Sequence, residues 1–90
     1  GFIEVGTVTP QPQEPNPSPI LDRHIQQKAL WNKMGFPNKG LDFLHSQLLR
    51  LPKPHPTPIF VNIGKNRTTS NEEALSDYLS CLRKLKNEAD

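Results

Sequence analysis

Two polar stretches each follow an apolar run, and they carry the residue types best suited to binding chemistry. The first run ends in Gly6 and Thr7, and the second, PIFVN, ends at Asn62, shortly before Gly64 and Lys65. Threonine and asparagine offer neutral, directional hydrogen bonds, and glycine lets a ligand approach the backbone closely. Such groups suit an uncharged planar heterocycle with several donors and acceptors.

The residues leave a simpler interpretation of Asn62 open, because an asparagine at a strand end can pair only with nearby backbone. A phosphate loop is excluded at Gly64 and Lys65. The Walker pattern needs a glycine five residues before this pair and a hydroxyl residue after it, and Ile59 and Asn66 occupy those positions. The stretch therefore predicts hydrogen bonding rather than phosphate binding.

A second polar interruption lies in WNKMGF, residues 31–36. The spacing of apolar residues over 25–34 predicts a short helix that Gly35 ends, so Asn32 on its own has the ordinary interpretation of a solvent-exposed helical residue. No Ser/His/Asp or Cys/His constellation is visible, and none of the histidines has the spacing of a metal ligand. We therefore expect neither a metal site nor a catalytic residue, and we place three histidines at the surface: His24, His45 and His55.

The elements that must position these groups alternate between strands and helices. Residues 2–8 predict a buried strand, and prolines from Pro10 to Pro19 predict an extended, polyproline-like excursion. After the helix over 25–34, Asn38 is expected to cap a second helix, whose leucine stripe ends before Pro52. The stripe contains Leu41, Leu44, Leu48 and Leu51.

A second strand follows in PIFVN, and a third helix is expected after it. Ser70 and Glu73 have the spacing of a capping box at its start. Cys81 borders the apolar face of this helix, where we expect a passive packing role. The residues that form the face are Leu75, Tyr78, Leu79, Leu82 and Leu85.

This order is a βαβα unit, and a crossover of this length predicts a parallel strand pair with outer helices. Parallel strands normally have both faces covered. The fold class is therefore α/β, with two parallel strands, outer helices and a Pro-rich insertion, expected as a fragment of a (β/α)8 TIM barrel of about 250 residues. Ligands bind such barrels at the carboxyl ends of the strands, where Thr7 and Asn62 stand.

The amino-acid composition narrows the possible classes of protein further. The chain has 90 residues, ten of them proline, and only 33% are apolar, so its own core is expected to be thin and its independent stability low. The net charge is only +2, and the basic residues are scattered and matched by acidic ones, which argues against a nucleic-acid surface. No stretch is apolar and long enough to cross a membrane. The start without methionine predicts a chain cut from a larger protein.

Several separated motifs together resemble the class 2, quinone-dependent dihydroorotate dehydrogenases, flavoenzymes of pyrimidine biosynthesis. They occur in the family's order and approximate spacing over almost the whole chain. The matching stretches are FIEVGTVTPQPQ (2–13), NPSP (16–19), the lone Arg23, WNKMGF (31–36), NKGLD (38–42), VNIGKN (61–66) and NEEALSDYLSCL (71–82).

The resemblance implies that residues 1–90 are part of an FMN-binding (β/α)8 barrel domain. Gly6, Thr7 and Asn62 match cofactor-binding positions. The segment Asn32, Lys33, Met34, Gly35 and Phe36 matches the substrate-binding stretch for dihydroorotate and orotate, and Arg23 matches a position near the quinone route. The family's catalytic serine base would lie beyond Asp90, so the isolated fragment is expected to be inactive.

The resemblance also implies a peripheral membrane association, at a bacterial or mitochondrial inner membrane, through an N-terminal region outside these residues. Two alternatives stay open. One is a non-catalytic binding or scaffold domain derived from this barrel, which the proline excursion favours. The other is a soluble class 1 dihydroorotate dehydrogenase, which shares the barrel and FMN but lacks the VNIGKN and NKMGF patterns.

Overall fold

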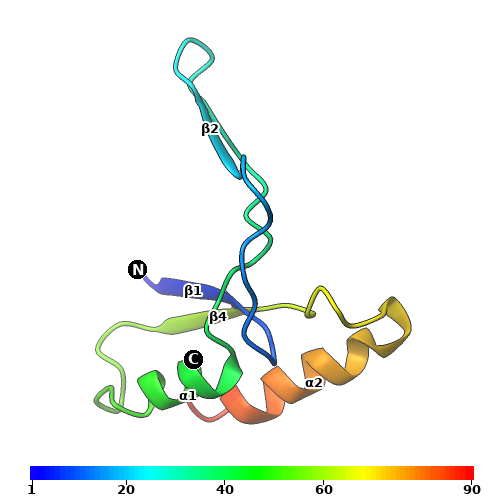
Figure 1. The fold of residues 1–90 in the computed structure, drawn as a ribbon. Coiled ribbons are helices and arrows are strands. Elements are labelled where there is room, and N and C mark those ends of the chain that lie inside the picture. The colour runs from blue at the N-terminus through cyan, green and yellow to red at the C-terminus, as the bar shows by residue number, and fades with distance from the viewer.

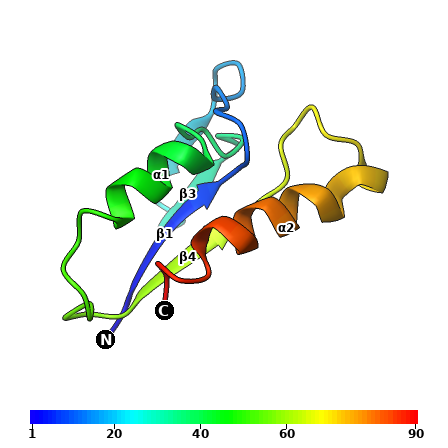
Figure 2. The same cartoon turned by 90° about the horizontal axis from the view of Figure 1, so that it is seen from below.

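The computed structural model describes all of residues 1–90 as a two-stranded parallel sheet with helices on one side and a projecting hairpin (Figure 1). Figure 2 shows the two long helices flanking the strands on the same face. In chain order the elements are β1 (Ile3–Val8), β2 (Leu21–His24), β3 (Ala29–Asn32), α1 (Leu41–Leu48), β4 (Ile59–Ile63), the 3-10 turn Asn71–Glu73 and α2 (Ala74–Leu85).

The predicted strands form and pair in parallel, as the length of the crossover required. Ile3 lies beside Ile59, and Val5 lies beside Val61. Because successive side chains on a strand point to opposite faces, alternate β4 residues pack toward the helices, while Phe60 is 42% exposed on the other face. The sheet therefore has one covered face and one open face.

The core is as thin as the composition predicts, since only nine of 90 residues are buried. Leu41 and Leu48 of α1 meet Cys81 and Leu85 of α2 beneath Val8. Cys81 is fully buried and lies at the centre of the packed helix face, which confirms its packing role and corrects its expected place at the border.

The rest of the predicted α2 face is turned away from this core. Leu75 is 67% exposed and Leu82 is 55% exposed. The helix is rotated so that Asp77, Cys81 and Leu85, spaced four residues apart, lie on its covered side. Of the predicted α2 face, Leu85 is buried, Leu79 is half-buried, and Leu75, Tyr78 and Leu82 are exposed.

The predicted helix over 25–34 is wrong, because these residues form one arm and the turn of an antiparallel hairpin. Leu21 pairs with Asn32, and His24 pairs with Ala29. All residues from 21 to 34 are exposed, so a helix here would have no packed face to stabilise it. Backbone pairing to a nearby segment satisfies the same groups without burial, and Lys28 closes the turn with a φ of 52°.

The hairpin continues into the proline-rich excursion, which is extended as predicted but also paired. Prolines cannot donate, so the ladder uses the amides that remain. The amide of Lys33 donates to the carbonyl of Ile20 at 2.9 Å, and the amide of Asn16 donates to that of Met34 at 2.9 Å. The hairpin therefore stands on a two-stranded stalk that joins the body near β1 (Figure 1).

Two predicted helix caps are absent. Gly40, with a φ of 91°, is the N-cap of α1, and Asn38 instead accepts a hydrogen bond from the Gly40 amide at 2.8 Å. Ser70 precedes the 3-10 turn and Glu73 ends it, immediately before α2, but neither side chain makes a capping hydrogen bond. The start of α2 therefore lacks the predicted capping side chains, and Asn38 contacts the N-cap residue of α1 instead of being the N-cap itself.

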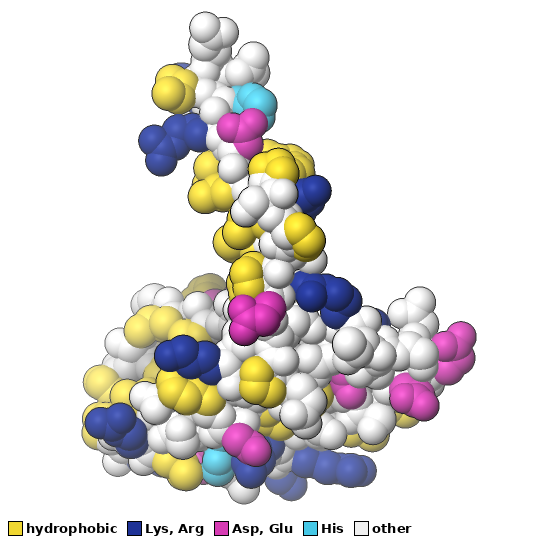
Figure 3. Space-filling view, viewed as in Figure 1, with side chains coloured by type: hydrophobic (Ala, Val, Ile, Leu, Met, Phe, Trp, Pro, Cys, Tyr) yellow, Lys and Arg dark blue, Asp and Glu magenta, His cyan; other side chains and the backbone are white.

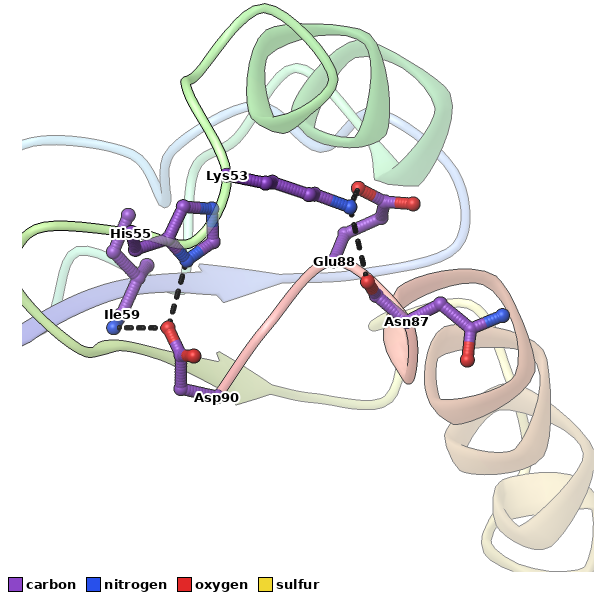
Figure 4. A network of polar contacts seen from close by, with 6 residues as sticks. All are labelled: Lys53, His55, Ile59, Asn87, Glu88 and Asp90. Atoms are coloured by element: carbon purple, nitrogen blue, oxygen red, sulfur yellow. Dashed lines mark hydrogen bonds and ion pairs between the residues drawn. The ribbon is translucent and has the colours of Figure 1, made fainter.

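His55 contradicts the surface prediction, because its side chain is only 5% exposed. Its Nδ1 lies 2.7 Å from Oδ2 of Asp90, which also accepts from the amide of Ile59 at 2.9 Å (Figure 4). The amide of Asp90 donates to the carbonyl of Ile59 at 2.8 Å, and Lys53 forms an ion pair with Glu88. The chain after α2 is thereby fastened to the start of β4.

Apolar side chains are also exposed along the hairpin (Figure 3). Ile25 is 77% exposed and Leu30 is 65% exposed.

None of the helices has both the length and the apolar character that a membrane crossing requires.

Candidate functional site

Thr7 and Asn62 meet at the carboxyl edge of the sheet, where the hydroxyl of Thr7 donates to Oδ1 of Asn62 at 2.7 Å. Strict alternation would place Thr7 on the helix side with Val5. The register instead shifts between Gly6 and Val8, so that Val8 enters the core and Thr7 reaches Asn62. A bulge re-aims a side chain in this way.

Gly6 is required where these strands approach. It pairs with Asn62 at a φ of 122°, and a Cβ there would lie 2.5 Å from the Asn62 carbonyl oxygen. A side chain at this position would therefore separate β1 from β4.

The pair keeps hydrogen-bonding capacity for a ligand. The Thr7 hydroxyl spends its hydrogen on Asn62, and its lone pairs can still accept. The Asn62 amide nitrogen makes one long contact, 3.5 Å to a carboxylate oxygen of Glu4, so it retains a hydrogen to donate. An adjacent donor and acceptor match the edge of a heterocycle that carries a carbonyl beside an N–H.

The segment from Asn32 to Phe36 lies against this edge. All five of its residues, together with Gly6 and Thr7, line a cavity of about 550 Å³. A second cavity of about 400 Å³ shares Thr7 and Phe36 with the first and adds Asn62. The structure thus brings the two groups of predicted site residues, distant in sequence, to adjoining cavities.

The backbone of this segment is clamped from the stalk. The side-chain nitrogen of Asn16 donates to the carbonyl of Lys33 at 2.8 Å, and that of Gln13 donates to the carbonyl of Gly35 at 2.8 Å. Phe36 has a φ of 53°, a conformation that non-glycine residues seldom adopt, and its side chain is 57% exposed. The clamp leaves the phenyl ring and the Asn32 amide free to face a ligand.

A buried network of amides supports the site, and among its members a role was predicted only for Asn38, as a helix cap. Asn66 is 5% exposed, and its side chain accepts from the amide of Gln11 at 2.9 Å and donates to the hydroxyl of Thr9 at 3.1 Å. Asn38 donates to the same hydroxyl at 2.8 Å. The only sequence signal for these residues was their place in the matching stretches 2–13, 38–42 and 61–66.

Three cations line the cavities, and two of them, Lys65 and Arg67, are engaged by backbone, while the ammonium of Lys33 lies 5.9 Å from the centroid of the Trp31 ring. The ammonium of Lys65 donates to the carbonyls of Asn66 and Thr69 at 3.0 Å and 2.7 Å. Arg67 donates to the carbonyls of Glu14 and Gly35 at 3.1 Å and 3.3 Å. The hydrogen-bonding surface offered by Thr7, Asn62 and Asn32 is therefore mostly neutral.

Two groups have clearly shifted pKa values, and neither lines these cavities. Burial raises the pKa of the Cys81 thiol, and the negative charge of Asp77 raises it further. Hydrogen bonds with His55 and the Ile59 amide lower the pKa of Asp90. No group of three or more His, Cys, Asp or Glu side chains gathers in a way that could hold a metal ion.

Arg23 does not join the other predicted site residues. It lies in β2 on the projecting hairpin and lines a separate hollow of about 360 Å³ with residues of the hairpin turn. A role for Arg23 near a quinone stays a prediction.

Sequence relatives match this chain closely. A protein named dihydroorotate dehydrogenase (quinone) from Nitratiruptor sp. is 53% identical over 78 residues, which are 87% of this chain and 22% of that protein. A protein of the same name from Deinococcus deserti is 51% identical over 90 residues, which are 100% of this chain and 24% of that protein. The chain spans about a quarter of the length of these curated relatives.

Solved structures agree. Ligand-free DHODH from Eimeria tenella superposes with a TM-score of 0.84 at 36% identity, over 99% of this chain and 26% of that one. The complex of DHODH from Eimeria tenella with ferulenol gives 0.85 at 35% identity, over 99% and 25%. The family model for dihydroorotate dehydrogenase matches residues 1–90. The chain therefore belongs to the dihydroorotate dehydrogenase family, as its motifs indicated.

Proposed function

We propose that these residues are part of an enzyme that oxidises dihydroorotate to orotate, with a quinone as electron acceptor, in the de novo synthesis of pyrimidines. The observation that carries the proposal is the meeting of the Thr7–Asn62 pair with the segment Asn32–Phe36 at adjoining cavities. The names of the relatives, which specify a quinone, support the choice of electron acceptor.

We propose that the two βα units belong to an FMN-binding (β/α)8 barrel domain. The rings of Phe2 and Phe60 pack in a tilted arrangement on the open face of the sheet, with centroids 4.9 Å apart, which suits the inner wall of a barrel whose other strands lie outside residues 1–90. The amide of Asp90 donates to the carbonyl of Ile59, which leaves the chain beside β4, where a further strand of the barrel is proposed to lie. The exposed leucines of α2 provide a surface for the next helix.

FMN fits the edge formed by Gly6, Thr7 and Asn62. The flavin ring carries carbonyls beside an N–H, and the free acceptor of Thr7 and the free donor of Asn62 complement that order. Gly6 leaves room for close approach. When bound, the flavin supplies the hydride acceptor for the reaction.

The segment Asn32, Lys33, Met34, Gly35 and Phe36 is proposed to bind the substrate. Asn32 offers an amide to the carbonyl and N–H groups of a pyrimidine ring, and Phe36 offers an apolar face that excludes water. The segment is held by its backbone, so the neutral side chains of Asn32 and Phe36 can orient a ring without themselves adding an acid or base to the reaction. The proton-abstracting base is proposed to come from outside residues 1–90.

Two further features are proposed from the family. Arg23, on the exposed hairpin, is proposed to lie on the side from which a quinone reaches the flavin. The complete enzyme is proposed to be a peripheral protein of a bacterial or mitochondrial inner membrane, anchored by residues outside this chain. The exposed apolar hairpin residues are consistent with a covering segment on that side.

The test replaces Asn62 by alanine in the full-length protein. Loss of one amide hydrogen bond to the cofactor is expected to weaken FMN binding by about tenfold. FMN content is measured from visible absorbance, and dihydroorotate oxidation is measured with a soluble quinone. Asn71→Ala is the matched control, because Asn71 is exposed and its side chain makes no hydrogen bond.

Two results would contradict the proposal. A full-length protein that binds no FMN or does not oxidise dihydroorotate would remove the function. An Asn62→Ala variant that keeps FMN and activity at the level of Asn71→Ala would remove the role of Asn62 while leaving the family function in place.

A further inference from the structure

We propose that Gln13 is a positioning residue that sets the distance between the substrate segment and the flavin edge. Its side chain bridges the turn at Gly35 and Phe36, which follows β3, to the turn at Asn66 and Arg67, which follows β4. The inference rests on the proposed function, because it concerns the substrate of that same site.

Every hydrogen-bonding position of the Gln13 carboxamide is used. Its nitrogen donates to the carbonyl of Gly35 at 2.8 Å and, more weakly, to that of Phe36 at 3.5 Å. Its oxygen accepts from the amide of Arg67 at 2.7 Å and from the side chain of Asn66 at 3.2 Å. With two donors and two acceptors engaged, the group has nothing left for a ligand, so it acts through the turns that it joins.

The backbone of Gln13, from which this side chain extends, is fixed as well. The amide of Gln13 donates to the carbonyl of Asn38 at 2.9 Å, and the amide of Asn38 donates back to Gln13 at 3.0 Å. The carboxamide is therefore anchored on a short backbone bridge and is not free to follow a turn that moves.

The turn that Gln13 contacts has a backbone conformation that outside contacts must stabilise. Gly35 has a φ of 81° and Phe36 a φ of 53°, so two consecutive residues adopt left-handed backbone conformations, the second at a cost because it carries a side chain. A Cβ at Gly35 would lie 2.6 Å from the Arg67 guanidinium and 2.6 Å from Oδ1 of Asn16. The turn is thus pressed against the β4 side, and the Gln13 carboxamide holds the two together.

Phe36 and Gly35 line both cavities, whereas Asn62 lines only the one of about 400 Å³. A turn released from Gln13 would move the phenyl ring and Asn32 relative to Asn62. Substrate binding would weaken, while the Thr7–Asn62 pair, which shares no hydrogen bond with Gln13, would keep the cofactor.

The experiment uses the full-length protein loaded with FMN and compares Gln13→Glu with Gln11→Ala. Glutamate keeps the shape and the accepting oxygen but replaces the donating nitrogen with an oxygen that faces the Gly35 carbonyl. Gln11 is the matched control, since its side chain is exposed and makes no hydrogen bond. Because Gln13→Glu is nearly isosteric, the test does not depend on a truncated variant that fails to fold.

We expect Gln13→Glu to raise the KM for dihydroorotate by about tenfold, with the FMN-to-protein ratio unchanged, and Gln11→Ala to change neither. A merely structural defect would lower the amount of active enzyme, and so kcat, without moving KM. Hydrogen exchange of the amides in residues 33–39 supplies a second readout, and it should speed up in Gln13→Glu alone.

An unchanged KM together with unchanged exchange in residues 33–39 would overturn the inference, as would a loss of FMN at constant KM. If the wild-type protein does not oxidise dihydroorotate, the proposed function fails. The exchange measurement then still decides whether Gln13 holds the turn.

Discussion

Replacing Asn66 by alanine tests the buried amide network that underlies the site. Asn66 is 5% exposed, and its side chain contacts Thr9 and two residues of the excursion, Gln11 and Gln13. Its oxygen accepts from the amide of Gln11 at 2.9 Å. Its nitrogen donates to the Thr9 hydroxyl at 3.1 Å, the Gln11 carbonyl at 3.0 Å and the Gln13 carboxamide at 3.2 Å.

The magnitude follows from which partners keep another hydrogen bond. The Gln11 carbonyl still accepts from Thr9, and Gln13 Oε1 still accepts from Arg67. Only the Gln11 amide loses its sole partner, at a cost of about 1–3 kcal/mol, and the two hydrogens of the Asn66 nitrogen forfeit about 0.5–1.5 kcal/mol each. Allowing for overlap between these terms, Asn66→Ala should lower the free energy of unfolding by about 2–4 kcal/mol.

The assay is equilibrium urea unfolding of the full-length protein, with FMN in excess in every sample so that the cofactor contributes equally. Asn71→Ala, at an exposed position, should stay within about 0.5 kcal/mol of wild type. Asn66→Asp sharpens the test, because its carboxylate keeps an acceptor for Gln11 but turns an oxygen toward three other oxygens. It should be at least as destabilising as alanine at neutral pH.

Two results would refute this reasoning. One is an Asn66→Ala variant as stable as Asn71→Ala, which would mean that water replaces the network without loss. The other is an Asn66→Asp variant clearly more stable than Asn66→Ala, which would mean that the donating nitrogen contributes nothing.

Three further predictions concern the body of the fold. Leu48 is 4% exposed, so Leu48→Ala should lower the free energy of unfolding by about 2–5 kcal/mol in the same urea titration. The neighbouring Leu49 is 56% exposed, so Leu49→Ala should lower it much less. Because its contact with His55 and the Ile59 amide lowers the pKa of Asp90 below the usual 3.8, the carboxylate stabilises the fold above that pH, and the effect is lost as pH falls through the lowered pKa. Asp90→Asn should therefore be less stable than wild type at neutral pH, and the two stabilities should converge in acid; a constant difference would exclude this linkage. Burial and a raised pKa should keep Cys81 unmodified by a maleimide in the native protein, as followed by peptide mass spectrometry, until urea exposes it; fast native labelling would contradict its packing.

The apolar runs were sufficient to predict β1 and β4, their parallel pairing and the positions of α1 and α2. These elements have long, one-sided patterns, and the crossover between the strands leaves little choice of topology. The residues that cap the helices were less predictable. Asn38 and Ser70 are good capping residues by type, but Asn38 is taken up by Thr9 and Gly40, to which no local pattern points.

The hairpin shows where the spacing of apolar residues fails to predict the secondary structure. Apolar spacing over 25–34 fits a helix, but spacing decides only where a face is buried, and here every residue is exposed. The decision fell to antiparallel backbone pairing of β3 with the preceding strand β2, which continues along the stalk between residues 20 and 33 and between 16 and 34. Asn32 consequently lies at the end of a strand and not on a helix.

The sequence by itself determined the family, the two strands and the neutral polar residues that follow them, because residue types and their order are local facts. Only the tertiary structure decided that Thr7 turns to Asn62 through a bulge, and that Gln13 and Asn66 join three loops. Those contacts connect residues up to 57 positions apart. Their geometry depends on how the strands, the stalk and the helices pack, which no window along the chain contains.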